Sequence, residues 1–130
     1  EVLRAQGYVT RRSPKGPDGG VDILAGFGPL GFDPPRLCVQ VKSSGSPVDV
    51  NVLRELQGTM ATHQADHGLL VSWGGFKDSV WRESKVSYFK VRLWDSGDLL
   101  SALLDNYDKL PDGLRAELPL KKVWAVVAED

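Results

Sequence analysis

The sequence is short of sulfur and of net charge, and each shortage excludes a class of protein. Its 130 residues contain one cysteine, Cys38, so no disulfide forms within the chain, and we expect a reducing, cytoplasmic compartment. Lysine and arginine number 16 against 17 acidic residues, a formal net charge of -1. Such a chain does not coat nucleic acid by electrostatics alone, although a local basic patch is compatible with this balance.

Long hydrophobic runs are also absent. No apolar stretch approaches the roughly 18 residues that a membrane-spanning helix needs, so we expect no membrane partner. The composition, 42% hydrophobic and 25% charged, and the length predict one globular domain over residues 1–130. Methionine occurs once, at Met60, and the chain opens in what reads as the second half of a helix. We therefore expect an N-terminally truncated fragment of a longer protein.

The hydrophobic spacing predicts strands first, then helices that alternate with strands. After a truncated helix at residues 1–6 come strands at 8–12, 21–25 and 36–43, the last two joined by a long hairpin loop at 26–35. The remaining predictions are a helix at 48–64 capped by Asp49 or Asn51, a strand at 67–73, a helix at 76–84, a strand at 86–94, a helix capped by Ser96 or Asp98, a break at 111–113, and a strand or packed extended tail at 121–127. This order predicts an α/β fold with a mixed sheet.

The strand at residues 36–43 alternates in character. One face carries apolar side chains and the other carries the chemically active ones: Leu37, Val39 and Val41 against Cys38, Gln40 and Lys42. We predict that the first face packs into the core and that the second is a working surface.

Two motifs imitate functional sites. The string GFGPLG at residues 26–31 has the glycine spacing of a dinucleotide-binding turn, but paired prolines follow it where a helix must start, so we interpret it as a hairpin loop. His63 and His67, four residues apart, would share a face for a metal only within one helix. We expect the helix to end between them and both histidines to be solvated.

One group of residues indicates chemistry. Asp22 lies between Val21 and Ile23, where a carboxylate is costly unless a partner compensates it. The next strand offers Gln40 and Lys42 on one face, so an acid, an amide oxygen and an ammonium converge. This set suits metal-assisted phosphodiester hydrolysis, in which the acid and amide hold a divalent cation and the lysine stabilises developing charge. The alternative is a plain ion pair between Asp22 and Lys42, with Gln40 solvated.

Several strings together resemble one family. GPDGGVDI, VQVKSS, a helix containing ELQG, and GLLVSWGGF are similar to the Mrr-type restriction endonuclease domain of the PD-(D/E)XK nuclease superfamily. The similarity extends from RAQGY near the start to the leucines at 99–104. It implies a three-layer restriction-endonuclease-like fold, a central mixed sheet flanked by helices with an αβββαβ core, and cleavage of DNA that leaves 5′-phosphate ends. Gln40 replaces the acid of most superfamily members, as is usual in the Mrr branch.

The resemblance also implies roles for individual residues. Asp22, Gln40 and the backbone carbonyl of Val41 would ligate Mg²⁺, or Mn²⁺ in its place, and Lys42 would be catalytic. A further glutamate is expected on the first helix, before residue 1, with Glu1 out of register. Glu55 is expected to face solvent.

Contacts to DNA are predicted on both sides of this group. The candidates for phosphate contacts are Arg11, Arg12, Lys15, Ser43 and Ser44, with ordinary loop polarity as the alternative for each. Trp73 ends a strand either at a ligand-binding edge or in the core, and Trp81, Trp94 and Trp124 are expected to pack.

These observations favour one function and leave others open. The first hypothesis is a metal-dependent DNA endonuclease that restricts foreign or methylated DNA. The alternatives are a Holliday-junction resolvase or repair nuclease of the same fold, and a catalytically weakened domain that only binds DNA or a partner. A homodimer is expected, because cutting both strands needs two sites.

Overall fold

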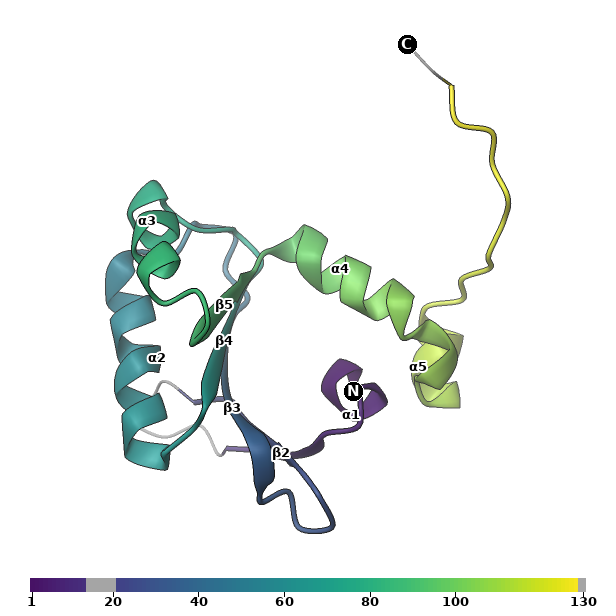
Figure 1. Cartoon of the computed structure of the whole chain (residues 1–130). Helices are drawn as coiled ribbons and strands as arrows, with labels where there is room; N and C mark the ends of the chain where they lie inside the picture. The colour runs from purple at the N-terminus through teal and green to yellow at the C-terminus, as the bar shows by residue number, and fades with distance from the viewer. Residues whose placement is uncertain (14–20, 129–130) are drawn as a thin grey trace.

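A single mixed sheet organises the domain (Figure 1). The computed structural model describes residues 1–13 and 21–128. Five strands follow one another across the sheet in chain order: β1 (Val9–Arg12), β2 (Ile23–Phe27), β3 (Asp33–Lys42), β4 (His67–Ser72) and β5 (Val91–Trp94). The first three pair antiparallel and the last three pair parallel, with β3 at the change of direction.

Helices cover both faces of this sheet. These helices are α1 (Val2–Ala5), α2 (Val50–His63), α3 (Asp78–Val86) and α4 (Ser96–Asp105). A 3₁₀ turn at Tyr107–Lys109 and α5 (Asp112–Glu117) follow α4. Figure 1 shows α2 and α3 on one face and α1 and α4 on the other. The predicted three-layer α/β fold with an αβββαβ core is confirmed.

Each face packs its own core. Under α2 and α3 lie Cys38, Leu53, Leu56, Leu70 and Val80, all fully buried. A smaller cluster toward α1 and α4 contains Leu3, Ala25, Val39, Leu69 and Val71. A sheet whose parallel part is covered on both faces needs apolar residues on both, which is why β3 and β4 carry apolar residues at consecutive positions.

The predicted alternation of β3 is present, but the working surface is not the open face. Cys38 and Gln40 are buried, whereas Val41, predicted to be core, has 42% of its surface exposed. The reason is tertiary, because α2 packs on the face that carries Cys38 and Gln40. The opposite face is left partly open at the carboxyl end of β3.

The hairpin between β2 and β3 is shorter than predicted. Residues 33–35, predicted as loop, begin β3, and β2 extends to Phe27. The two prolines are tolerated there because β4 begins to pair with β3 only at Leu37, so no neighbouring strand requires their missing N–H groups. The register of β2 against β3 shifts between Ala25 and Phe27.

Residues 86–90 are not a strand. The helix α3 runs to Val86, a turn closed by the Lys90 N–H on the Ser87 carbonyl follows, and β5 starts at Val91. Valine, tyrosine and phenylalanine in this segment have the composition of a strand, but Val86 ends the helix and Tyr88 and Phe89 project from the turn. Val86 and Phe89 are strongly exposed.

The last third of the chain also differs from its prediction. Asp95, and not Ser96 or Asp98, caps α4, and Asp98 completes a reciprocal capping box. A further helix, α5, begins at Asp112, inside the predicted break at 111–113. Residues 121–127 form no strand, and Trp124, expected to pack, is fully exposed. In Figure 1 this yellow segment extends away from the sheet. Within the described residues, no helix is long and apolar enough to cross a membrane.

Candidate active site

The hairpin brings Asp22 beside Gln40. Asp22 lies just before β2, outside the regular pairing of β2 with β3, which begins at Ile23↔Val39. Its backbone N–H donates to the Val39 carbonyl at 2.8 Å, and its Oδ2 accepts the Val41 N–H at 2.6 Å. Asp22 is therefore hydrogen-bonded to the residues on both sides of Gln40.

Hydrogen bonding holds the Asp22 carboxylate at the end of β3. The Val41 backbone N–H donates to Asp22 Oδ2 at 2.6 Å. On the other side of β3, the Lys42 carbonyl accepts the Trp73 N–H at 2.9 Å. Because the N–H and C=O of one strand residue point the same way and alternate along the strand, the Val41 carbonyl is directed toward the Asp22 side. The Asp22 carboxylate and the Val41 carbonyl therefore lie on the same side of β3.

Gln40 carries an unsatisfied polar atom. The residue is 2% exposed, and its Oε1 has no hydrogen-bond partner within the described part of the chain. A buried acceptor without a partner costs about 1–3 kcal/mol, and such groups are rare unless a ligand satisfies them. A carboxylate, an amide oxygen and a backbone carbonyl are the hard oxygen ligands that Mg²⁺ and Mn²⁺ take. The residues present therefore fit a divalent cation.

The charge of this site is low. No group of three or more histidine, cysteine, aspartate or glutamate residues gathers anywhere in residues 1–13 and 21–128. Lys42 is half-buried at the end of β3, and neither it nor Asp22 takes part in an ion pair with another described residue. The alternative of a simple Asp22–Lys42 ion pair is not what the structure shows.

The candidate phosphate-binding residues divide between the two faces. Arg11 pairs with Leu24 and shares the face of Cys38, whereas Arg12 pairs with Ile23 and points to the other face. Both arginines are exposed. Ser43 and Ser44 are exposed after β3, and Ser44 Oγ accepts the Ser46 N–H at 3.1 Å. Lys15 lies outside the described residues.

A groove of about 290 Å³ borders Lys42 on the partly open face. Its lining comes from the ends of β3 and β4 and from α4: Val41, Lys42, Ser43, Val71, Trp73, Ser96 and Leu99. Trp73 is 60% exposed, so its possible place in the core is excluded. Sequence reasoning missed this groove because it assigned Val41 to the core. The sequence signal that could have indicated the groove was Trp73 at a strand end, followed directly by Gly74 and Gly75.

Comparison with protein families shows to which family the domain belongs. A family model described as Restriction endonuclease (Mrr_cat) matches residues 1–103, more than half of the chain. The chain belongs to this Mrr-type restriction endonuclease family. The resemblance carried by the motifs is thereby confirmed, and the domain is of the DNA endonuclease class.

Solved structures share the fold of this endonuclease domain. The DNA modification-dependent restriction endonuclease AspBHI superposes with a TM-score of 0.64 at 18% identity, over 91% of this chain and 32% of that one. The MspJI restriction endonuclease in complex with a 27-mer oligonucleotide gives 0.59 at 23% identity, over 89% and 28%. An uncharacterized mitochondrial protein of Schizosaccharomyces pombe is 28% identical over 89 residues, 66% of this chain and 36% of that protein. The chain thus spans about a third of that relative's length.

Other titratable residues of the endonuclease domain lie away from the site or are inert. Glu55 is exposed on α2, as predicted, and His63 ends α2 while His67 begins β4, so the two histidines do not share a helix. The Glu1 carboxylate pairs with Arg4 at 3.1 Å. Burial raises the pKa of the Cys38 thiol, which therefore stays protonated and is neither a ligand nor a nucleophile.

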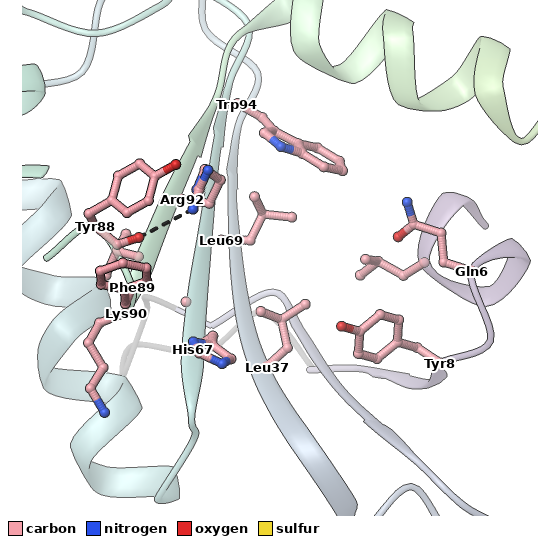
Figure 2. A pocket seen from close by; sticks show the side chains of 13 residues that line it. Gln6, Tyr8, Leu37, His67, Leu69, Tyr88, Phe89, Lys90, Arg92 and Trp94 are labelled. Atoms are coloured by element: carbon pink, nitrogen blue, oxygen red, sulfur yellow. Dashed lines mark hydrogen bonds between the residues drawn. The ribbon is translucent and has the colours of Figure 1, made fainter. Parts of the chain in front are cut away.

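A second hollow, of about 220 Å³, lies between α1 and strands β3 to β5 (Figure 2). In Figure 2, Tyr8 and Gln6 face Leu37, Leu69 and Trp94 across it. None of the predicted catalytic residues lines it. Arg92, which lines this hollow, already interacts with Tyr88. Its guanidinium lies 4.4 Å from the Tyr88 ring centroid and donates to the Tyr88 carbonyl at 3.3 Å. This hollow is therefore separate from the candidate site at the end of β3.

Proposed function

We propose that this domain hydrolyses phosphodiester bonds of DNA with a divalent metal ion. Asp22, Gln40 and the Val41 carbonyl would hold Mg²⁺ or Mn²⁺, and Lys42 would act on the substrate. The observation that carries the proposal is the buried, unpartnered Oε1 of Gln40, a residue whose two chain neighbours are both hydrogen-bonded to Asp22. Membership of a restriction endonuclease family supports the reaction class.

The protein residues supply orientation and charge. A divalent cation bound there would polarise the scissile phosphate and the attacking water. The Val41 N–H fixes the Asp22 carboxylate before any ligand arrives, so little reorganisation is needed on binding. The cover that α2 gives to Gln40 excludes water and strengthens electrostatic interactions nearby. Lys42 would donate to a phosphate oxygen and stabilise the negative charge that develops.

The biological role that we propose is restriction of foreign or methylated DNA. AspBHI, which shares the fold, is described as dependent on DNA modification, and MspJI is described in complex with an oligonucleotide. Arg11 and Ser43 are proposed to contact phosphates beside the site, with Arg12, Lys15 and Ser44 in support. A homodimer would provide the two sites that double-strand cleavage needs.

A plasmid-nicking assay with matched variants tests the proposal. Cleavage by the parent should require Mg²⁺ or Mn²⁺ and stop in EDTA, and Asp22→Asn and Lys42→Met should each lower the rate at least about 100-fold. Asp22→Asn keeps an acceptor for the Val41 N–H, so its fold should survive. Asp33→Asn, exposed at the other end of β3, and Lys90→Met, exposed before β5, are the controls and should cut normally.

Cleavage by folded Asp22→Asn at the parental rate would show that the proposed site does not catalyse the reaction. Unmodified, methylated and branched DNA are compared in the same assay. Equal cutting of unmodified and methylated DNA would contradict methylation dependence, and exclusive cutting of branched DNA would replace restriction by junction resolution.

A further inference from the structure

Trp73 projects beside the proposed active site without an evident structural role. Its N–H bonds to the Lys42 carbonyl, so its Cα lies about one strand spacing, roughly 4.8 Å, from the end of β3. It takes part in none of the ring–ring contacts among the described residues. An indole that is 60% exposed next to a catalytic lysine contributes little to the core and is free to contact a ligand.

The groove that Trp73 lines has both apolar and polar walls. Val41, Val71 and Leu99 supply apolar side chains, and Lys42, Ser43 and Ser96 supply polar ones. By the alternation of β3, Val41 points to the face opposite Gln40. The end of the sheet therefore separates the proposed cation ligands from the groove, and Lys42 borders both.

The charges around the groove select an uncharged occupant. Ser96 begins α4, and the positive end of this helix is already capped by the carboxylates of Asp95 and Asp98. Two carboxylates repel a phosphate from this side of Lys42. A volume of about 290 Å³ is at the small end of the roughly 300–1,000 Å³ range of ligand pockets, so it admits one ring system. In DNA, the uncharged planar group of each nucleotide is the base, which the deoxyribose links to the phosphate.

We propose that the groove binds one nucleobase of the strand being cut, stacked on Trp73, while the adjoining phosphate lies at Lys42. This inference rests on the proposed function and specifies how that site holds its substrate. Every base has a π-face, so an indole platform adds affinity without selecting a sequence. Because the base must leave its own stack, unpaired or mismatched nucleotides should enter the groove most readily.

Binding measured in EDTA separates this contact from cleavage. Fluorescence anisotropy compares a thymidine oligonucleotide with an abasic strand of equal length. The parent should bind the thymidine strand about tenfold more tightly, and Trp73→Ala should bind both strands equally. Trp73→Phe should keep most of the preference. Trp124→Ala, which removes a fully exposed tryptophan from residues 121–128, is the matched control and should behave as the parent.

The possible results distinguish this inference from the proposed function. If folded Trp73→Ala, checked by thermal unfolding, retains the parental preference for thymidine, the stacking inference is overturned. Equal binding of both strands by the parent overturns it as well. Either of these two results can occur together with metal-dependent DNA cleavage that Asp22→Asn abolishes. In that case the proposed function is retained and only the stacking inference is rejected. A parent that binds neither strand and cuts no DNA overturns both.

Discussion

At Gln40, burial and ligand binding have opposite effects on stability. The amide oxygen is buried without a partner, which destabilises the folded state by about 1–3 kcal/mol relative to a satisfied group. A cation that binds there in the folded state alone removes this cost and stabilises the domain by mass action. Metal binding should therefore be visible in the unfolding temperature as well as in activity.

Replacing Gln40 by methionine separates the two effects. Gln40→Met removes the unsatisfied oxygen at similar volume, so the metal-free variant should unfold at or above the parental temperature. Its unfolding temperature should no longer rise on addition of Mn²⁺. Gln57→Met, at a half-buried glutamine of α2, is the control and should keep the Mn²⁺ response. A Gln40→Met variant that Mn²⁺ stabilises as much as the parent would show that Gln40 is not a ligand.

A second carboxylate at this position should strengthen metal binding. Two unit charges 4 Å apart interact by about 4 kcal/mol at an effective dielectric of 20, and a divalent ion gains more before desolvation is subtracted. Gln40→Glu should therefore lower the dissociation constant for Mg²⁺ or Mn²⁺, measured by calorimetry. The cleavage rate can change in either direction because Lys42 gains an ion-pair partner. Unchanged metal affinity would argue against a ligand at residue 40.

At the scale of the structural elements, Asp66 links the start of β4 to β3 through hydrogen bonds with Arg36. Its Oδ2 accepts the Arg36 backbone N–H at 2.7 Å, and the Arg36 guanidinium lies at 3.4 Å. The backbone hydrogen bond, helped by the Arg36 charge, lowers the pKa of Asp66 below its ordinary value of 3.8. The carboxylate thus stabilises the folded state above the unfolded pKa, and this contribution is lost as pH falls through the folded pKa.

Removing this carboxylate should change the pH dependence of stability. Asp66→Ala should unfold at a lower temperature than the parent near pH 7, and the difference should narrow as the pH falls below about 4. Thermal unfolding followed by circular dichroism over this range measures both. Asp105→Ala, at an exposed aspartate of α4, is the comparison and should run parallel to the parent. A constant deficit of Asp66→Ala at every pH would mean that packing, not charge, was lost.

The sequence predicted elements well where one period dominates. The helix at residues 48–64 has helical spacing and an Asp49 cap, and the structure has α2 at Val50–His63 with Asp49 Oδ1 accepting the Asn51 N–H. Period two in β3 predicted Gln40 and Lys42 on one face, and the hairpin predicted Asp22 nearby, where the structure has it hydrogen-bonded to Val39 and Val41. Periodicity states which residues share a face, but not which face another element covers, so the burial of Gln40 and the exposure of Val41 depended on where α2 packs. The groove at Trp73 joins β3, β4 and α4, and no local pattern predicts such a junction.

At the scale of the whole molecule, DNA binding should depend only modestly on salt. A chain of net charge -1 with few basic residues at its site neutralises few phosphates, and each one neutralised contributes about -0.9 to the slope of log K against log[salt]. Arg11→Ala should make the slope shallower by about this amount, whereas Trp73→Ala should leave it unchanged. Anisotropy titrations at several salt concentrations measure the slopes. Arg92→Ala, in the hollow beside Tyr88, is the control, and an Arg11→Ala slope equal to that of the parent would remove Arg11 from the DNA interface.

The register shift between Ala25 and Phe27 separates the hairpin turn from the proposed site at Asp22 and Gln40. On the far side of the shift, the pairs Ile23↔Val39 and Leu24↔Cys38 lock the register, because a slip of one residue would move Gln40 to the other face. Residues 28–32 lie beyond this lock. Lengthening the turn should therefore leave Asp22 and Gln40 beside each other, so residues 28–32 offer a position at which a tag or a further domain can be inserted.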